Sequence, residues 1–272
     1  MNATHATCIA TLVTATLALP STAADPPSQK TVTMEEHFEE VANLLAEQDS
    51  FAAAQYLQRQ GSPSDVMTLF LKTTQWLHYN RKNVPGMIAI SQAGIHYGLT
   101  EAERVKDANG ETADKLRGTA KAISFNLAAN TWPGWDDEGI VLTQSDYRVG
   151  LDAARLNLRL AIELKRDPLP VCNAHWLLGV HQIVAGDESA AATSLEHAIE
   201  QAQAADREDY EFMCRGYAAI AALHASPDAS RHRDQLDHCV SELKRLDTED
   251  SRFFADQLVS VHKVLVQPPD AP

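Results

Sequence analysis

The chain has 272 residues, of which 44% are hydrophobic and 6% aromatic, and its formal net charge is −14. This length and composition allow one long domain or two small ones with a real core. Sparse aromatic residues beside frequent Ala, Leu, Glu and Gln favour helix over strand. The acidic balance argues against nucleic acid or an anionic membrane as the main partner, because both require a cationic surface.

The first 24 residues contain no Lys, Arg, Asp or Glu. An apolar, Thr-rich run from Cys8 ends at Pro20, and small residues that a signal peptidase can read follow it. We therefore expect a signal peptide over residues 1–24 and a periplasmic or secreted protein. Because no Lys or Arg precedes the run, a disordered cytoplasmic leader is the alternative. Pro and polar residues predict a disordered linker at 25–31 and a disordered tail at 267–272.

The remaining chain shows helical spacing of apolar residues, as in Phe38, Val41 and Leu45. Gly61–Ser62–Pro63 and the segment 167–170 are typical of breaks between helices. No alternating run of β-branched residues predicts a strand, and no apolar stretch is long enough for a membrane span. The predicted helices are 34–48, 50–60, 64–81, 86–98, 112–130, 146–166, 171–185, 188–204, 208–225, 230–246 and 249–265.

A long connection at 131–145 separates two of these helices and holds Trp132 and Trp135, followed by three acidic residues. Helical hairpins usually need only a short turn, and long loops with bulky aromatics are often functional. A packed loop with both indoles buried at the groove edge is the other interpretation. The acidic residues lack the alternating ligands of a calcium loop, so no metal site is predicted.

The window 172–205 has the spacing of a helical hairpin. The positions that carry it are His175, Leu178, Gly179, Gln182, the turn Gly186–Asp187, Ala191, Leu195 and Ala198. The small residues Gly179 and Ala191 allow two antiparallel helices to cross closely, and Leu195 fills the space beside them. This pattern resembles the tetratricopeptide repeat, with His175, Gln182 and Leu195 at positions where the family has an aromatic residue, Tyr and Phe. Weaker copies of the second-helix spacing occur earlier in the chain.

The resemblance implies an all-α solenoid, a superhelix of stacked antiparallel hairpins forming one domain over residues 32–266. In tetratricopeptide arrays the first helix of each hairpin lines a concave groove. The groove positions carried over to this chain are Asn173, Trp176, Val180, Ile183 and Val184. None is Lys or Arg, which departs from the charged clamp of some family members. Such a groove could bind an apolar helix or extended peptide, or it could be filled by neighbouring helices of the solenoid.

Side chains that could support chemistry are few. His175 and His181 are six residues apart on one helix, so they face different directions and cannot share a metal ion. Cys172, Cys214 and Cys239 lie in apolar helical contexts that favour buried free thiols, and an odd number permits at most one bridge among them. No nucleophile elbow, phosphate loop or dinucleotide fingerprint is present, so neither catalytic residues nor cofactors are predicted.

These patterns predict an exported protein-binding module, an adaptor or assembly scaffold, whose partner is a protein or peptide. The predicted partner-binding residues are Trp132, Trp135, Asn173, Trp176, Val180, Ile183 and Val184. An alternative of another class is an envelope or extracellular hydrolase with its site under the Trp132–Trp135 loop. A structural role through self-association is a third hypothesis, which an exposed apolar end repeat would mark.

Overall fold

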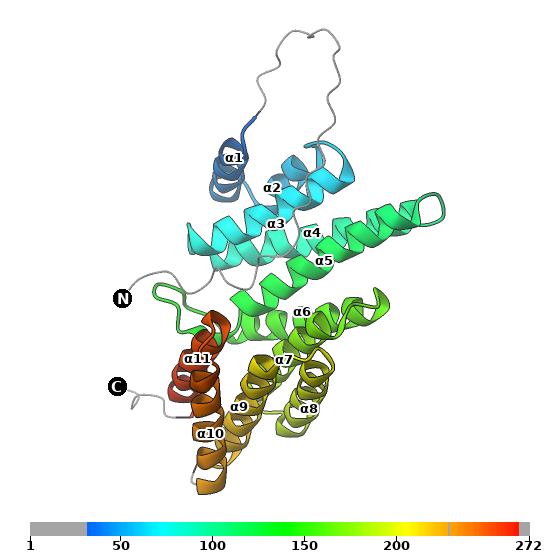
Figure 1. Cartoon of the computed structure of the whole chain (residues 1–272). Helices are drawn as coiled ribbons and strands as arrows, with labels where there is room; N and C mark the ends of the chain where they lie inside the picture. The colour runs from blue at the N-terminus through cyan, green and yellow to red at the C-terminus, as the bar shows by residue number, and fades with distance from the viewer. Residues whose placement is uncertain (1–31, 228, 267–272) are drawn as a thin grey trace. The chain divides into compact units, whose positions relative to one another are not determined.

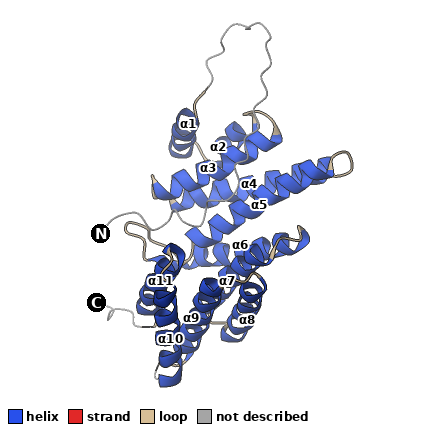
Figure 2. Ribbon diagram, viewed as in Figure 1, coloured by secondary structure: helices blue, strands red, loops and turns tan. Residues whose placement is uncertain are grey.

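The computed structural model describes residues 32–227 and 229–266. Over these residues the protein is all-α, with eleven α-helices, one short 3-10 helix and no strand (Figure 2). The predicted signal peptide 1–24, the linker 25–31 and the tail 267–272 lie outside the described residues. None of the described helices is long and apolar enough to cross a membrane.

The helices follow one another with short connections, except between α5 and α6 (Figure 1). They are α1 (Met34–Glu47), α2 (Ser50–Gln58), α3 (Pro63–Tyr79), α4 (Val84–Val105), α5 (Gly110–Asn130), η1 (Pro133–Trp135), α6 (Gln144–Glu163), α7 (Pro168–Val184), α8 (Glu188–Ala204), α9 (Glu208–Ala225), α10 (Ser230–Leu246) and α11 (Glu249–Leu265). The predicted ranges agree with these bounds to within a few residues, apart from the end of α4.

The prediction ended α4 at Gly98, but the helix continues to Val105. Gly98 is an interior position where another element approaches closely: a Cβ there would lie 2.4 Å from the terminal methyl of Met67 on α3. This glycine therefore marks helix packing instead of a helix end. The start of α7 was also predicted late, because Pro168 and Pro170 occupy its first turn, where a missing backbone N–H leaves no hydrogen bond unmade.

The described residues from Met34 to Val266 form one compact unit, in which each helix packs on the next one along the chain. The most extensive of these contacts join α7 to α8 and α4 to α5. The apolar face of one helix is therefore covered largely by its neighbours in sequence. This consecutive packing agrees with the expected stacking of helical hairpins.

The hairpin of α7 and α8 has the close crossing that the sequence predicts. A Cβ at Gly179 would lie 2.8 Å from the Leu195 side chain on α8, so only glycine permits this approach. Gly186 makes the turn with a φ of 72°, which favours glycine. Asp187 then caps α8 by accepting a hydrogen bond from the backbone N–H of Ala190, 3.1 Å away.

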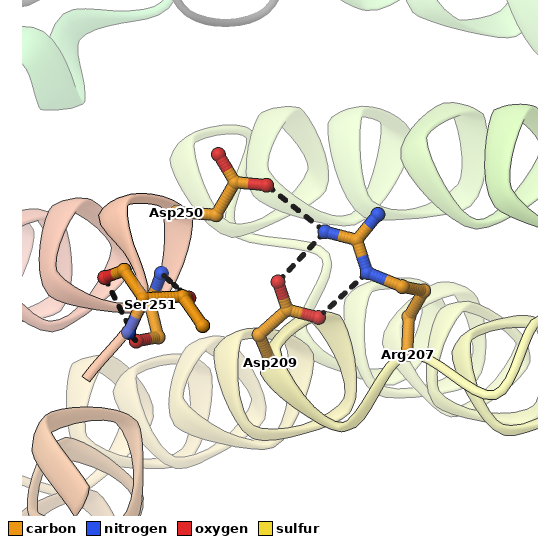
Figure 3. A network of polar contacts seen from close by, with 5 residues as sticks. Arg207, Asp209, Asp250 and Ser251 are labelled. Carbon is orange, nitrogen blue, oxygen red and sulfur yellow. Dashed lines mark hydrogen bonds and ion pairs between the residues drawn. The ribbon is translucent and has the colours of Figure 1, made fainter. Parts of the chain in front are cut away.

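The last helix, α11, packs on α9, on α10 and on η1 in the long connection. Its N-terminal end is fixed by Arg207, which lies between α8 and α9 (Figure 3). The guanidinium donates two hydrogen bonds to Asp209, at 2.9 and 2.7 Å, and one to Asp250 of α11, at 2.9 Å. One cation thus joins the start of α9 to the start of α11.

Candidate functional site

The long connection between α5 and α6 is held by hydrogen bonds to α5 and to α7. The Trp132 indole N–H donates to the carbonyl of Val180 on α7, at 3.2 Å, and the Trp135 indole N–H donates to the carbonyl of Ala129 on α5, at 2.8 Å. Trp132 is only 1% exposed. Each indole therefore has its hydrogen-bond partner within the protein, as a packed tryptophan requires.

Four aromatic rings meet where this connection crosses α7 and α9. The Trp132 ring lies 5.0 Å from Trp135, 6.5 Å from Trp176 and 5.9 Å from Tyr217, measured between ring centroids. Trp176 and Tyr217 are themselves 5.5 Å apart. Gly134 permits the arrangement, because a Cβ there would lie 2.2 Å from the Trp132 ring. These rings form a continuous cluster in which Trp132, Trp176 and Tyr217 are buried and Trp135 is partly exposed.

The structure places the predicted partner-binding residues mostly inside the core. Trp132, Trp176, Val180 and Ile183 are buried, whereas Trp135, Asn173 and Val184 keep part of their surface exposed. The four buried side chains offer a partner no surface in this structure. Of the two interpretations of the groove and the loop, burial favours the filled groove and the packed loop.

The acidic end of the connection lies against α3, a contact that the sequence analysis did not anticipate. A carboxylate oxygen of Asp137 is 3.7 Å from Nε2 of the buried His78, and Lys82 donates to the carbonyl of Glu138. The pairs are more than fifty residues apart in sequence, and no local pattern links them. These contacts hold the loop to the end of α3 and to the turn that follows it, and they give Asp137 and Glu138 neighbours within the protein.

The two histidines of α7 face different elements, as their spacing predicts. Nε2 of His181 lies 2.9 Å from the carbonyl of Ala128 on α5, whereas the His175 ring lies 5.2 Å from that of His197 on α8. Burial lowers the pKa of His181 to about 4. Burial, followed by the neighbouring His197, lowers the pKa of His175 to about 4. Both rings are therefore neutral at pH 7 and serve packing. Within the described ranges, no three His, Cys, Asp or Glu side chains lie close enough together to hold a metal ion.

A cleft of about 650 Å³ opens between the end of α4, the start of α5 and the end of α6. Its apolar side chains are largely buried and form a floor, while its charged side chains form the rim. The lining residues are Leu99, Ala102, Glu103, Lys106, Gly110, Ala113, Asp114, Arg117, Arg159, Leu160 and Glu163. Ligand sites in proteins commonly have this size, but most are lined mainly by apolar side chains, whereas six of these eleven residues are charged.

Ion pairs organise the rim of this cleft. Glu163 of α6 pairs with Arg117 of α5 and lies 3.7 Å from Arg159. Lys106, directly after α4, pairs with Glu103 of that helix. These pairs are largely exposed and stabilise the fold little. The ion pairs can therefore be replaced by contacts with a bound molecule.

Two further cations lie beside the cleft, Lys121 on α5 and Arg166 in the connection after α6. Lys121 is one helical turn beyond Arg117, and the residue is half-buried. Burial, and secondarily the charge of Arg166, lowers the pKa of Lys121 to about 8. The Arg166 guanidinium lies against α5 at Gly118, where a Cβ would be 2.7 Å from one of its nitrogens. This side of the cleft therefore places positive charge on an acidic protein.

Sequence reasoning missed this cleft. It lies where three helix ends meet, and the end of α4 that lines it falls in the segment 99–105, beyond the predicted end of that helix. No protein-family model matches the chain, and neither a curated protein nor a solved structure matches it.

Proposed function

We propose that this protein is an exported protein-binding module, an adaptor or assembly scaffold built as a tetratricopeptide-like solenoid. Export rests on the uncharged leader with its apolar run. The repeat assignment is supported by the consecutive helix packing and by the close crossing at Gly179. The binding role is supported above all by one observation, the cleft at the ends of α4, α5 and α6.

The chemistry of the cleft indicates which partner it suits. Ala102, Ala113 and Leu160 line the cleft but are almost fully buried, so its apolar surface is small and comes mainly from Leu99, which can contact a small apolar side chain. The paired charges of the rim can exchange partners with polar groups that flank such an anchor. The neighbouring Lys121 and Arg166 favour an acidic flank. The partner we propose is therefore a protein segment with an apolar anchor beside acidic residues.

Gly110 offers a way to block the cleft without disturbing the fold. It lines the cleft, it is exposed, and a Cβ placed on it meets no atom within 4 Å. In Gly110→Trp the indole should occupy the cleft and exclude the partner's anchor. Gly110→Ala is the matched control, because it adds a Cβ at the same position while leaving the cleft open.

The test is a cross-linked pull-down from envelope and secreted fractions, with the full chain tagged at its C-terminus as bait. An amine-reactive cross-linker should join the partner to Lys106, which lies at the rim, in preference to Lys244 on α10. We expect capture by the wild type and by Gly110→Ala, and at least a tenfold loss with Gly110→Trp, or about 1.4 kcal/mol. Equal capture by all three baits, or none by the folded wild type, would contradict the proposal.

A further inference from the structure

Two of the three described cysteines lie in contact inside the core. The sulfur atoms of Cys172 on α7 and Cys214 on α9 are 3.8 Å apart, and both side chains are fully buried. The two residues are 42 positions apart in sequence, so a bond between them would join α7 to α9 and enclose α8. The third cysteine, Cys239, lies separately on α10.

The contact between the two sulfurs is held in register by the aromatic cluster. Trp176 lies one helical turn after Cys172, and Tyr217 lies three residues after Cys214, so each pair shares a helix face. The rings of Trp176 and Tyr217 are in contact, with centroids 5.5 Å apart. Packing of these large rings therefore presents the two thiols to each other. A disulfide has an S–S distance of about 2 Å, and side-chain rotation with a small helix adjustment closes the difference.

We propose that Cys172 and Cys214 form a disulfide that is made while the protein folds, and that Cys239 remains a thiol. In the reaction the two thiols release two protons and two electrons, and one S–S bond forms. The electrons pass to a disulfide oxidant, such as glutathione disulfide or an oxidised dithiol protein. That oxidant is cleaved to two thiols through a mixed-disulfide intermediate.

The timing follows from burial of the pair. The thiolate is the form that attacks a disulfide, and burial, with the contact to Cys172, raises the pKa of Cys214 above its usual range. An oxidant also has no access to a fully buried sulfur. The folded, reduced protein should therefore oxidise slowly, whereas an unfolded or partly folded chain has ordinary thiols. Burial raises the pKa of Cys239 to about 11, which leaves this thiol unreactive in the folded protein.

The experiment starts from the full chain, reduced and denatured, and refolds it in a glutathione redox buffer. Free thiols are then alkylated under denaturing conditions, and peptide mapping locates any bond. Before alkylation we expect a mass about 2 Da below that of the reduced chain, and after it a peptide pair linked through Cys172 and Cys214 with Cys239 alkylated. Alkylation of Cys172 and Cys214, or a bond that includes Cys239 or Cys8, would refute the pairing.

A second measurement separates the bond from a merely packed pair. Closing a loop of this length in the unfolded chain stabilises the folded state, so reduction should lower the thermal midpoint by several degrees. Cys239→Ser should keep that shift, whereas Cys172→Ala should lose it. Equal shifts in both variants would overturn the proposal. Rapid oxidation of the folded, reduced protein by glutathione disulfide would refute formation during folding.

Discussion

The indole of Trp132 occupies the space between the long connection and α7. It is buried, contacts the rings of Trp176 and Tyr217, and donates its only hydrogen bond to the carbonyl of Val180. Trp135 packs on its edge but remains partly exposed. The loop is therefore a structural element, because the Trp132 side chain is part of the core and not of the surface.

Trp132→Ala should therefore destabilise the protein by about 3–5 kcal/mol, the usual cost of deleting a large buried aromatic side chain. Trp135→Ala should cost clearly less, because part of that ring is already in water. Urea denaturation followed by circular dichroism measures both. If Trp132→Ala unfolds at the wild-type urea concentration, the indole is not the core residue that the structure shows.

His181 couples stability to pH. Its pKa falls from the ordinary 6.5 to about 4 on folding, because burial disfavours the charged ring. The His181 ring thus binds a proton near pH 6.5 in the unfolded chain, but only near pH 4 in the folded protein. The contribution of His181 to the free energy of unfolding is therefore fully present above pH 6.5. It is lost as the pH falls from 6.5 towards 4, by up to about 1.4 kcal/mol per pH unit.

The free energy of unfolding, measured between pH 7 and 5.5, should therefore decrease with falling pH. Most carboxylates remain ionised over this range, so histidines dominate the change. His181→Gln keeps an amide that can donate to the carbonyl of Ala128 but does not titrate, and its slope should be smaller. An unchanged slope in this variant would show that His181 is not responsible.

Among the elements, α11 depends most clearly on a contact distant in sequence. Arg207 stacks over the Tyr210 ring, with its guanidinium carbon 4.6 Å from the centroid, and Tyr210 packs edge-on against Phe254 of α11. Its hydrogen bonds to Asp209 and Asp250 complete the attachment (Figure 3). Because Asp209 is almost buried, its charge needs this partner.

Arg207→Met should destabilise the protein by about 2–3 kcal/mol, since the apolar stem still covers Tyr210 while Asp209 loses its charged partner. In this variant, relative to the wild type, hydrogen exchange should be accelerated more for the backbone amides of α11 than for those of α7. Arg252→Met is the control, because Arg252 pairs with Asp247 on the surface, where ion pairs contribute little. A similar loss of stability in both variants would mean that the burial of Asp209 beside Arg207 is unimportant.

Helix boundaries were predictable because their signals are local. Ser62 and Asp65 form a capping box at the start of α3, and Thr143 and Asp146 form another at the start of α6. Such residues satisfy backbone N–H groups within their own turn, so they act whatever the rest of the chain does. Gly98 was misread because an interior glycine has the same sequence signature as a helix end, and only the side chain packed against it distinguishes the two.

Across the whole molecule, most helix contacts join neighbours in the chain. Two helices separated by a short turn readily pack together, so the all-α class and the consecutive packing follow from helical periodicity and short connections, whereas the stacking of hairpins is what the repeat resemblance implies. The candidate site did not follow in the same way. Of the seven positions chosen from the loop and the repeat resemblance, four are buried and three keep part of their surface exposed, so their role in binding stays a prediction.

By itself, the sequence determined the helical class, nearly all helix bounds and the close crossing at Gly179, because propensity, capping and periodicity act over a few residues. Only the tertiary structure decided what fills the space between helices. Packing of α11 on η1, the contact of Cys172 with Cys214 and the cleft at the ends of α4, α5 and α6 all join segments far apart in the chain. These contacts form because surfaces that meet in the folded protein are buried together. No local sequence pattern specifies which surfaces meet.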